Sequence, residues 1–185
     1  YNLGESFLNY NVPFKNNKID GLVEVLYEDG KTKSIINFSE GLRSGEEKEF
    51  YKTGEKKYIF SNLNNQPEGE YLSFYENGNT ESKGAYKEGV MIGNWQYYNY
   101  YGEKTEEVFY DEKGKKTGLY KQYDIDGIVY SEVDYKNGDP VAYRFFNKKG
   151  ETIKDVKKSK GSFEYEGFYA DGVVSTKGIY KTDMG

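Results

Sequence analysis

Residues 69–89 read GEYLSFYENGNTESKGAYKEG, and the pattern within this stretch indicates the fold. Aromatic residues fill its first half, Glu-Asn-Gly follows in the middle, and another aromatic residue precedes the closing glycine. Asn-Gly between two strand-forming runs is a strong hairpin signal, because a tight reversal of the chain needs a residue with positive φ. The stretch therefore predicts strand, turn, strand, turn, and the question is whether it is a single hairpin or one copy of a repeated unit.

The spacing of the glycines answers this question. Gly69 and Gly78 lie nine residues apart, and the same interval recurs at Gly21/Gly30, Gly45/Gly54, Gly93/Gly102 and Gly118/Gly127. The pairs Val141/Gly150 and Phe163/Gly172 keep the interval without the first glycine. The second members stand at positions 30, 54, 78, 102, 127, 150 and 172, in steps of 24, 24, 24, 25, 23 and 22 residues. Such a period indicates a repeat array, with copies that start near residues 21, 45, 69, 93, 118, 141 and 163.

Aromatic residues recur at fixed places within the copies. Five residues after the first glycine position stand Leu26, Phe50, Phe74, Tyr98, Tyr123 and Phe146, and two residues after it stand Val23, Glu47, Tyr71, Trp95, Tyr120 and Tyr143. A unit of about 24 residues cannot bury its own aromatic face, so the copies must stack side by side. We predict an all-β fold, an elongated, single-layer, twisted antiparallel sheet of about seven stacked β-hairpins over residues 21–185.

The two ends of the array need protection from further strand pairing. Residues 1–20 break the repeat pattern, and we predict that they form an N-terminal cap or partial repeat over the first edge strand. The last copy, which ends at Gly185, is expected to form the other edge of the stack.

The composition limits the chemistry of the chain. It has 185 residues, a net charge of -5, and neither cysteine nor histidine. An acidic chain binds phosphate backbones poorly, so we expect no nucleic-acid partner. Without His and Cys, the commonest general base and the softest metal ligands are missing, so we expect no catalytic residues, no metal and no cofactor. No run of about 18 apolar residues occurs, so no integral membrane segment is expected.

One copy of the repeat carries a family resemblance. The run Gly93-Asn94-Trp95-Gln96-Tyr97-Tyr98, followed by Tyr101-Gly102-Glu103-Lys104, resembles the bacterial variant of the MORN repeat, and the resemblance extends over residues 21–182. It implies a groove-shaped, twisted sheet of hairpins. It also implies scaffolding and membrane-linked roles, often as dimers, while bacterial members are antitoxin-like or exported. The repeat motif is structural, so the resemblance assigns no site residue.

The candidate binding residues come from the aromatic columns. Tyrosine and tryptophan dominate binding hot spots, and a column on an open face would form a binding strip. We predict that this strip contains Tyr71, Trp95, Tyr97, Tyr120 and Tyr143, with Trp95 as the strongest candidate. The alternative is that periodic aromatic residues form the shared core of the hairpins, an interpretation that we favour for Phe74, Tyr98, Tyr123 and Phe146.

Charged residues offer weaker candidates. Glu81, Glu106 and Glu132 occupy similar places on second strands, and we interpret them as a solvated face rather than as acid–base pairs. Asp124-x-Asp126-Gly127 shares part of a calcium-loop pattern but lacks the remaining ligands, so a turn is expected. The basic segment around residues 148–160 is interpreted as a solvated edge.

From these observations we predict a non-catalytic binding or scaffold protein that holds a protein or glycan partner on an aromatic-rich repeat surface. The absence of an initiator methionine favours an exported or cell-surface setting. The alternative is an intracellular immunity protein, an antitoxin, that neutralises a basic toxin, since opposite charges speed association. A carbohydrate hydrolase or lyase is a third class, without an identified acid–base pair. A homodimer through a sheet face or a terminal edge strand is a further alternative.

Overall fold

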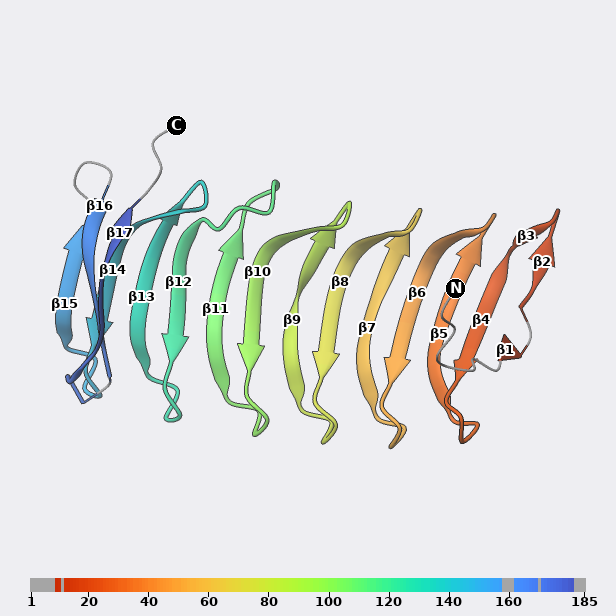
Figure 1. The fold of residues 1–185 in the computed structure, drawn as a ribbon, viewed down its shortest axis with the longest axis horizontal. Coiled ribbons are helices and arrows are strands. Elements are labelled where there is room, and N and C mark those ends of the chain that lie inside the picture. The colour runs from red at the N-terminus through yellow and green to blue at the C-terminus, as the bar shows by residue number, and fades with distance from the viewer. Residues whose placement is uncertain (1–8, 11, 158–161, 170, 182–185) are drawn as a thin grey trace. The chain divides into compact units, whose positions relative to one another are not determined.

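The computed structural model describes residues 9–10, 12–157, 162–169 and 171–181, and every helix or strand element among them is a β-strand (Figure 1). The predicted all-β architecture of antiparallel hairpins is confirmed. The chain divides into two compact units, which are described separately. The first contains residues 1–91 and 100–102, and the second contains residues 92–99 and 103–185.

The first unit is an antiparallel meander in which strands that follow each other in sequence are neighbours in the sheet. A short strand from the N-terminal segment, β1, pairs with the outer edge of β4, with Asn9 opposite Val25. A separate small hairpin, β2–β3, lies between them in sequence. The strands are β1 (Asn9–Tyr10), β2 (Phe14–Lys15), β3 (Lys18–Ile19), β4 (Gly21–Leu26), β5 (Thr32–Ser39), β6 (Leu42–Phe50), β7 (Lys56–Leu63), β8 (Gln66–Phe74) and β9 (Thr80–Lys87).

The second unit continues the same hairpin pattern and then departs from it. Its sheet ends at β15, because the last two strands form a two-stranded sheet of their own. The strands are β10 (Val90–Tyr98), whose first two residues belong to the first unit, β11 (Lys104–Tyr110), β12 (Gly118–Tyr123), β13 (Val129–Lys136), β14 (Asp139–Phe146), β15 (Thr152–Lys157), β16 (Ser162–Phe168) and β17 (Val174–Lys181).

The last hairpin corrects one expectation from the sequence. We expected the final copy to stack as the far edge of the array, but β16–β17 packs with its side chains on Tyr143 and Phe145 of β14. Tyr165 and Phe168 supply the apolar surface for this contact. In this arrangement Tyr143 and Phe145 are 1% and 3% exposed, and burial of an apolar side chain of this size contributes about 1.5–3 kcal/mol.

The second glycine of a copy lies in the turn that the sequence predicts for it. In the hairpin β8–β9, the Gly78 N–H donates to the Tyr75 carbonyl at 2.9 Å, the Tyr75 N–H donates to the Asn79 carbonyl at 2.8 Å, and Gly78 has a φ of 84°. This is a three-residue turn that ends in a left-handed residue. Consecutive copies are joined by tighter turns in which both central residues have positive φ, such as Glu88 (51°) and Gly89 (80°).

One face of the hairpins carries the buried side chains. We call it the inner face. It consists of the residue at the first glycine position of each copy, the residues two and four positions after it, and the residues opposite these on the second strand. The buried apolar residues are Val23, Ile36, Trp95, Val108, Tyr143 and Phe145. The buried polar residues are Ser34, Glu47, Asn62, Ser73, Ser82 and Ser131. The opposite surface is the outer face, and the period of two along each strand separates them.

A backbone prediction follows from the first glycine of the copies. Gly69 has a φ of 81° and no heavy atom within 4 Å of an added Cβ, so Gly69→Ala would introduce backbone strain without a clash. We expect a loss of about 1–2 kcal/mol in the free energy of unfolding, measured by denaturation in urea. The matched control is Gly178→Ala in β17, where the added Cβ also meets open space but φ is not positive. Equal effects of the two substitutions would contradict the backbone argument.

Candidate functional site

Four aromatic rings cross the inner face of the first unit. Tyr58 and Phe60 of β7, Tyr71 of β8 and Tyr86 of β9 form what we call the aromatic ladder, with successive ring centroids 5.5, 5.9 and 5.5 Å apart. Gly84 stands opposite Tyr71 in the register and has no side chain to cover its ring. All four rings are half-buried. The ladder therefore combines packed rings with aromatic surface that a partner can contact.

A buried carboxylate network borders this ladder. Glu47 is 3% exposed, and it accepts hydrogen bonds from Asn62 Nδ2 at 2.8 Å and from Arg43 Nη1 at 3.2 Å to each carboxylate oxygen. The Tyr58 hydroxyl lies 3.4 Å from Glu47 Oε1 and donates to Glu49 Oε2 at 2.8 Å. These donors come from β6 and β7, so the network joins the two strands on the inner face. It fixes the position of the first ring of the ladder.

The ionisation of Glu49 and Tyr58 is shifted by this network. Burial alone would raise the pKa of Glu49, but hydrogen bonds from Lys57 and Tyr58 outweigh it and lower the pKa. Burial and the neighbouring carboxylates raise the pKa of Tyr58, so its hydroxyl remains a proton donor. Both shifts favour a static hydrogen-bonded arrangement rather than proton transfer at neutral pH.

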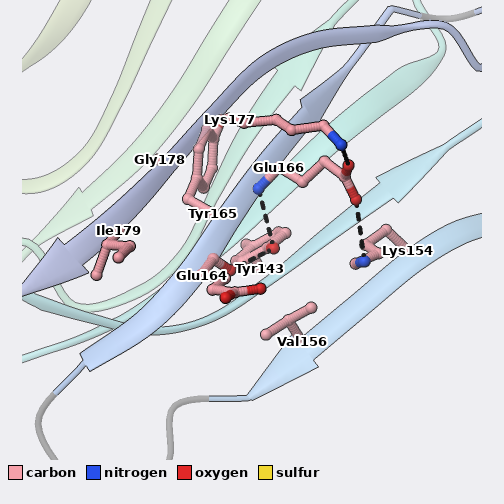
Figure 2. Close-up of a pocket in the computed structure, with 9 residues that line it drawn as sticks. All are labelled: Tyr143, Lys154, Val156, Glu164, Tyr165, Glu166, Lys177, Gly178 and Ile179. Atoms are coloured by element: carbon pink, nitrogen blue, oxygen red, sulfur yellow. Dashed lines mark hydrogen bonds and ion pairs between the residues drawn. The ribbon is translucent and has the colours of Figure 1, made fainter.

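The second unit contains a pocket of about 630 Å³ between β14–β15 and the last hairpin (Figure 2). At its edge, Glu166 of β16 pairs with Lys154 Nζ at 3.1 Å and with Lys177 Nζ at 2.8 Å. Hydrogen bonds from these two lysines lower the pKa of Glu166. The Tyr143 hydroxyl donates to the Glu164 carbonyl at 2.7 Å and accepts from the Glu166 N–H at 3.1 Å. The pocket thus holds one carboxylate between two ammonium groups above a buried tyrosine.

A second carboxylate cluster lies on the outer face of the second unit. Glu107 of β11 accepts hydrogen bonds from Asn94 and Tyr123 at 2.8 Å and from Gln96 at 3.0 Å, and it lies 3.4 Å from Lys104 Nζ. Burial alone would raise the pKa of Glu107, but these hydrogen bonds and the Lys104 charge lower it to about 2. The carboxylate borders an open depression of about 600 Å³ whose apolar surface comes from Phe109 and Leu119.

This cluster predicts a pH dependence of stability. Because the folded pKa of Glu107 is about 2, against 4.5 ordinarily, its carboxylate stabilises the fold above about pH 4.5, and this contribution is lost as the pH falls toward 2. The side chain is 24% exposed, so we discount the full shift for solvent screening and expect about 1–2 kcal/mol. Urea unfolding of the wild type and Glu107→Gln should differ by this amount at pH 7 and by much less at pH 2.5. Glu70→Gln, at an exposed carboxylate on the outer face, is the control, and a Glu107→Gln effect independent of pH would contradict the argument.

The five predicted binding residues lie in different environments in the structure. Tyr71 belongs to the aromatic ladder. Trp95 and Tyr143 are 2% and 1% exposed, so the core alternative is the one that fits their burial. Tyr97 is half-buried and stacks on Trp95, with ring centroids 6.3 Å apart. Tyr120 is half-buried in edge contact with Tyr135, and Lys116 Nζ lies 4.9 Å from its ring centroid.

The calcium-like stretch and the other polar candidates from the sequence can also be placed in the structure. Asp124 Oδ1 accepts from the Asp126 and Ile128 N–H groups, so the calcium-like stretch is a turn, as expected. Within the described ranges, no cluster of three or more Asp, Glu, His or Cys residues could hold a metal ion. The polar networks around Glu47 and Glu166 were not predicted. For Glu47 a signal exists, because it stands in a column that is otherwise apolar or aromatic.

Comparisons with known proteins agree with the repeat architecture. A family model described as the MORN repeat variant matches at residues 67–88, over nearly all of the hairpin β8–β9, and again at residues 116–137, over the hairpin β12–β13. A search of curated proteins returns no match. In the part of the chain that the structure describes, no helix is long and apolar enough to cross a membrane.

Two similar solved structures are both of TarM. One is a mutant of S. aureus TarM in complex with fondaparinux, alpha-GlcNAc-glycerol and UDP, with 16% identity and a TM-score of 0.25, and the match covers 73% of this chain and 21% of that one. The other is a crystal structure of TarM with 17% identity and a TM-score of 0.23, covering 71% of this chain and 21% of that one. The chain thus spans about a fifth of the length of these proteins, and a likeness of this degree carries no information on function.

Proposed function

We propose that the chain is a non-catalytic binding module that holds a protein partner on the inner face of its hairpins. The observation that carries this proposal is the aromatic ladder, in which four half-buried rings lie in one row across β7–β9. Rings already packed against one another lose little conformational freedom when a partner covers them, and aromatic residues supply much of the energy at protein interfaces.

The titrating carboxylates support a non-catalytic role. A general acid at neutral pH needs a raised pKa. Where the pKa of a carboxylate in the described residues is shifted, it is shifted downward, as for Glu49, Glu107, Asp111 and Glu166. Hydrogen bonds hold these groups ionised, so they act as fixed acceptors that position their neighbours.

A crosslinking experiment tests the proposal. The photoreactive residue benzoylphenylalanine is placed at position 71, on the inner face, or at position 72, on the outer face of the same strand, in the cells that naturally make the protein. We expect a discrete protein adduct from position 71 and none from position 72. Adducts that do not depend on the face, or no protein adduct at position 71, would contradict the proposal. For the partner identified by mass spectrometry, Tyr71→Ala should weaken binding by about 10- to 100-fold.

A further inference from the structure

The last hairpin is bound to the inner face mainly by side chains. The sheet order ends at β15, and β16 pairs only with β17, so β16–β17 is not a strand added to the sheet. The Tyr165 ring lies 5.0 Å from Tyr143, and the Phe168 ring lies 5.6 Å from Phe145. The hairpin therefore lies on the inner face in the way that a separate molecule would bind it.

The inner face reads both the main chain and a carboxylate of this hairpin. The Tyr143 hydroxyl donates to the carbonyl of Glu164 and accepts from the N–H of Glu166, two groups that any extended strand supplies. The inner face also recognises the Glu166 carboxylate through Lys154 of β15, while Lys177, opposite Glu166 on β17, pairs with it within the hairpin. Figure 2 shows Tyr143 between these main-chain groups and Lys154 beside the carboxylate.

The contact is also one that can be released. Of the two ion pairs of Glu166, only the one with Lys154 joins the hairpin to the inner face. The Lys154 side chain is 38% exposed, and exposed ion pairs contribute little. A pocket of about 630 Å³ remains beside them, so the hairpin does not fill the space that it covers. Ile179 of β17 lines this pocket and is 66% exposed. A segment that fills the space better would replace the hairpin.

We infer that β16–β17 is an internal occupant of the chain's own binding face, and that the protein partner binds β14–β15 with an extended or hairpin segment of the same chemistry. That segment presents two aromatic rings on one side with a carboxylate between them, as Tyr165, Glu166 and Phe168 do. This inference rests on the proposed function, in which the inner face is the binding surface, and it adds β14–β15 of the second unit as a separate place on that face where a partner segment binds. Binding of the partner and docking of β16–β17 are then mutually exclusive.

A labelled peptide with the sequence of residues 162–181 provides the probe. Its binding to the full-length chain is measured by fluorescence anisotropy for the wild type, for Glu166→Lys, and for the matched charge change Glu164→Lys. Glu166→Lys places a third cation beside Lys154 and Lys177 and weakens the internal occupant, so the peptide should bind this variant about tenfold more tightly than the wild type. Glu164→Lys should resemble the wild type, and a peptide with Tyr165 and Phe168 replaced by alanine should not bind.

Hydrogen exchange provides a second readout on the same variants. Amides of β16–β17 and of β14 should exchange faster in Glu166→Lys, whereas those of β4–β9 should not change, which also shows that the variant is folded. Equal peptide affinity for all three proteins, or equal binding of the alanine peptide, would overturn the inference. If either of those results occurred together with a face-specific adduct at position 71, the proposed binding function would stand. Only the inference that β16–β17 is an internal occupant would be rejected.

Discussion

Trp95→Ala is expected to lower the free energy of unfolding by about 3–5 kcal/mol, because it removes a large side chain from a site that cannot collapse fully. The Trp95 side chain is 2% exposed, lies opposite Val108 in the β10–β11 register and stacks on Tyr97. Trp95→Phe keeps an aromatic ring and should cost about 1–2 kcal/mol. Equilibrium unfolding in guanidinium, followed by circular dichroism, measures both.

The matched control for this prediction is an exposed aromatic residue. Tyr101 is 79% exposed, so Tyr101→Ala should change stability by no more than about 0.5 kcal/mol. If Trp95→Ala left stability within about 1 kcal/mol of the wild type and instead weakened partner binding, Trp95 would be a binding residue, as the sequence first suggested, and its burial here would be wrong.

Glu47→Ala is expected to destabilise the protein by about 2–4 kcal/mol, because it removes the acceptor of the buried Asn62 amide and the charge partner of Arg43. Glu47 is 3% exposed and accepts hydrogen bonds from Arg43 and Asn62, whereas the Tyr58 hydroxyl keeps its 2.8 Å hydrogen bond to Glu49. Arg43 is partly exposed, and we place the effect below that of a fully buried pair for this reason. Urea denaturation at pH 7 measures the change.

Glu46→Ala is the control, since Glu46 is the preceding residue on the outer face and pairs with Lys48 at the surface. Its removal should cost about 0.5 kcal/mol or less. Glu47→Gln should be intermediate, because it keeps one acceptor oxygen but loses the charge opposite Arg43. Similar effects of Glu46→Ala and Glu47→Ala would show that the network does not contribute to stability.

Much of the fold could be predicted because its signals are local and repeated. Asp-Gly and Asn-Gly pairs fix the turns, and the spacing of about 24 residues fixes the number of hairpins. The position of the last hairpin could not be predicted in this way. Its Asp171-Gly172 turn marks a hairpin but carries no information on whether that hairpin pairs with β15 or packs on β14. That choice depends on how Tyr165 and Phe168 fit against Tyr143 and Phe145.

The candidate site was only partly accessible from the sequence. The aromatic columns identify residues of one kind at one spacing, but not how deeply each is covered. Trp95 and Tyr71 occupy equivalent positions, yet Trp95 faces Val108 across the hairpin while Tyr71 faces Gly84. The residue opposite contributes to this difference but does not decide it alone, since Tyr120 faces Val133 and is half-buried. Sequence spacing alone does not show which residues face each other on neighbouring strands. It therefore could not distinguish a buried ring from an accessible one.

A nuclear Overhauser experiment on the full-length chain tests directly where the last hairpin lies. We predict contacts between the ring protons of Tyr143 and Tyr165 and between those of Phe145 and Phe168, because their centroids are 5.0 and 5.6 Å apart. A ladder of main-chain contacts between β15 and β16, without these ring contacts, would contradict the account. It would show instead that β16–β17 continues the sheet and leaves Tyr143 and Phe145 uncovered.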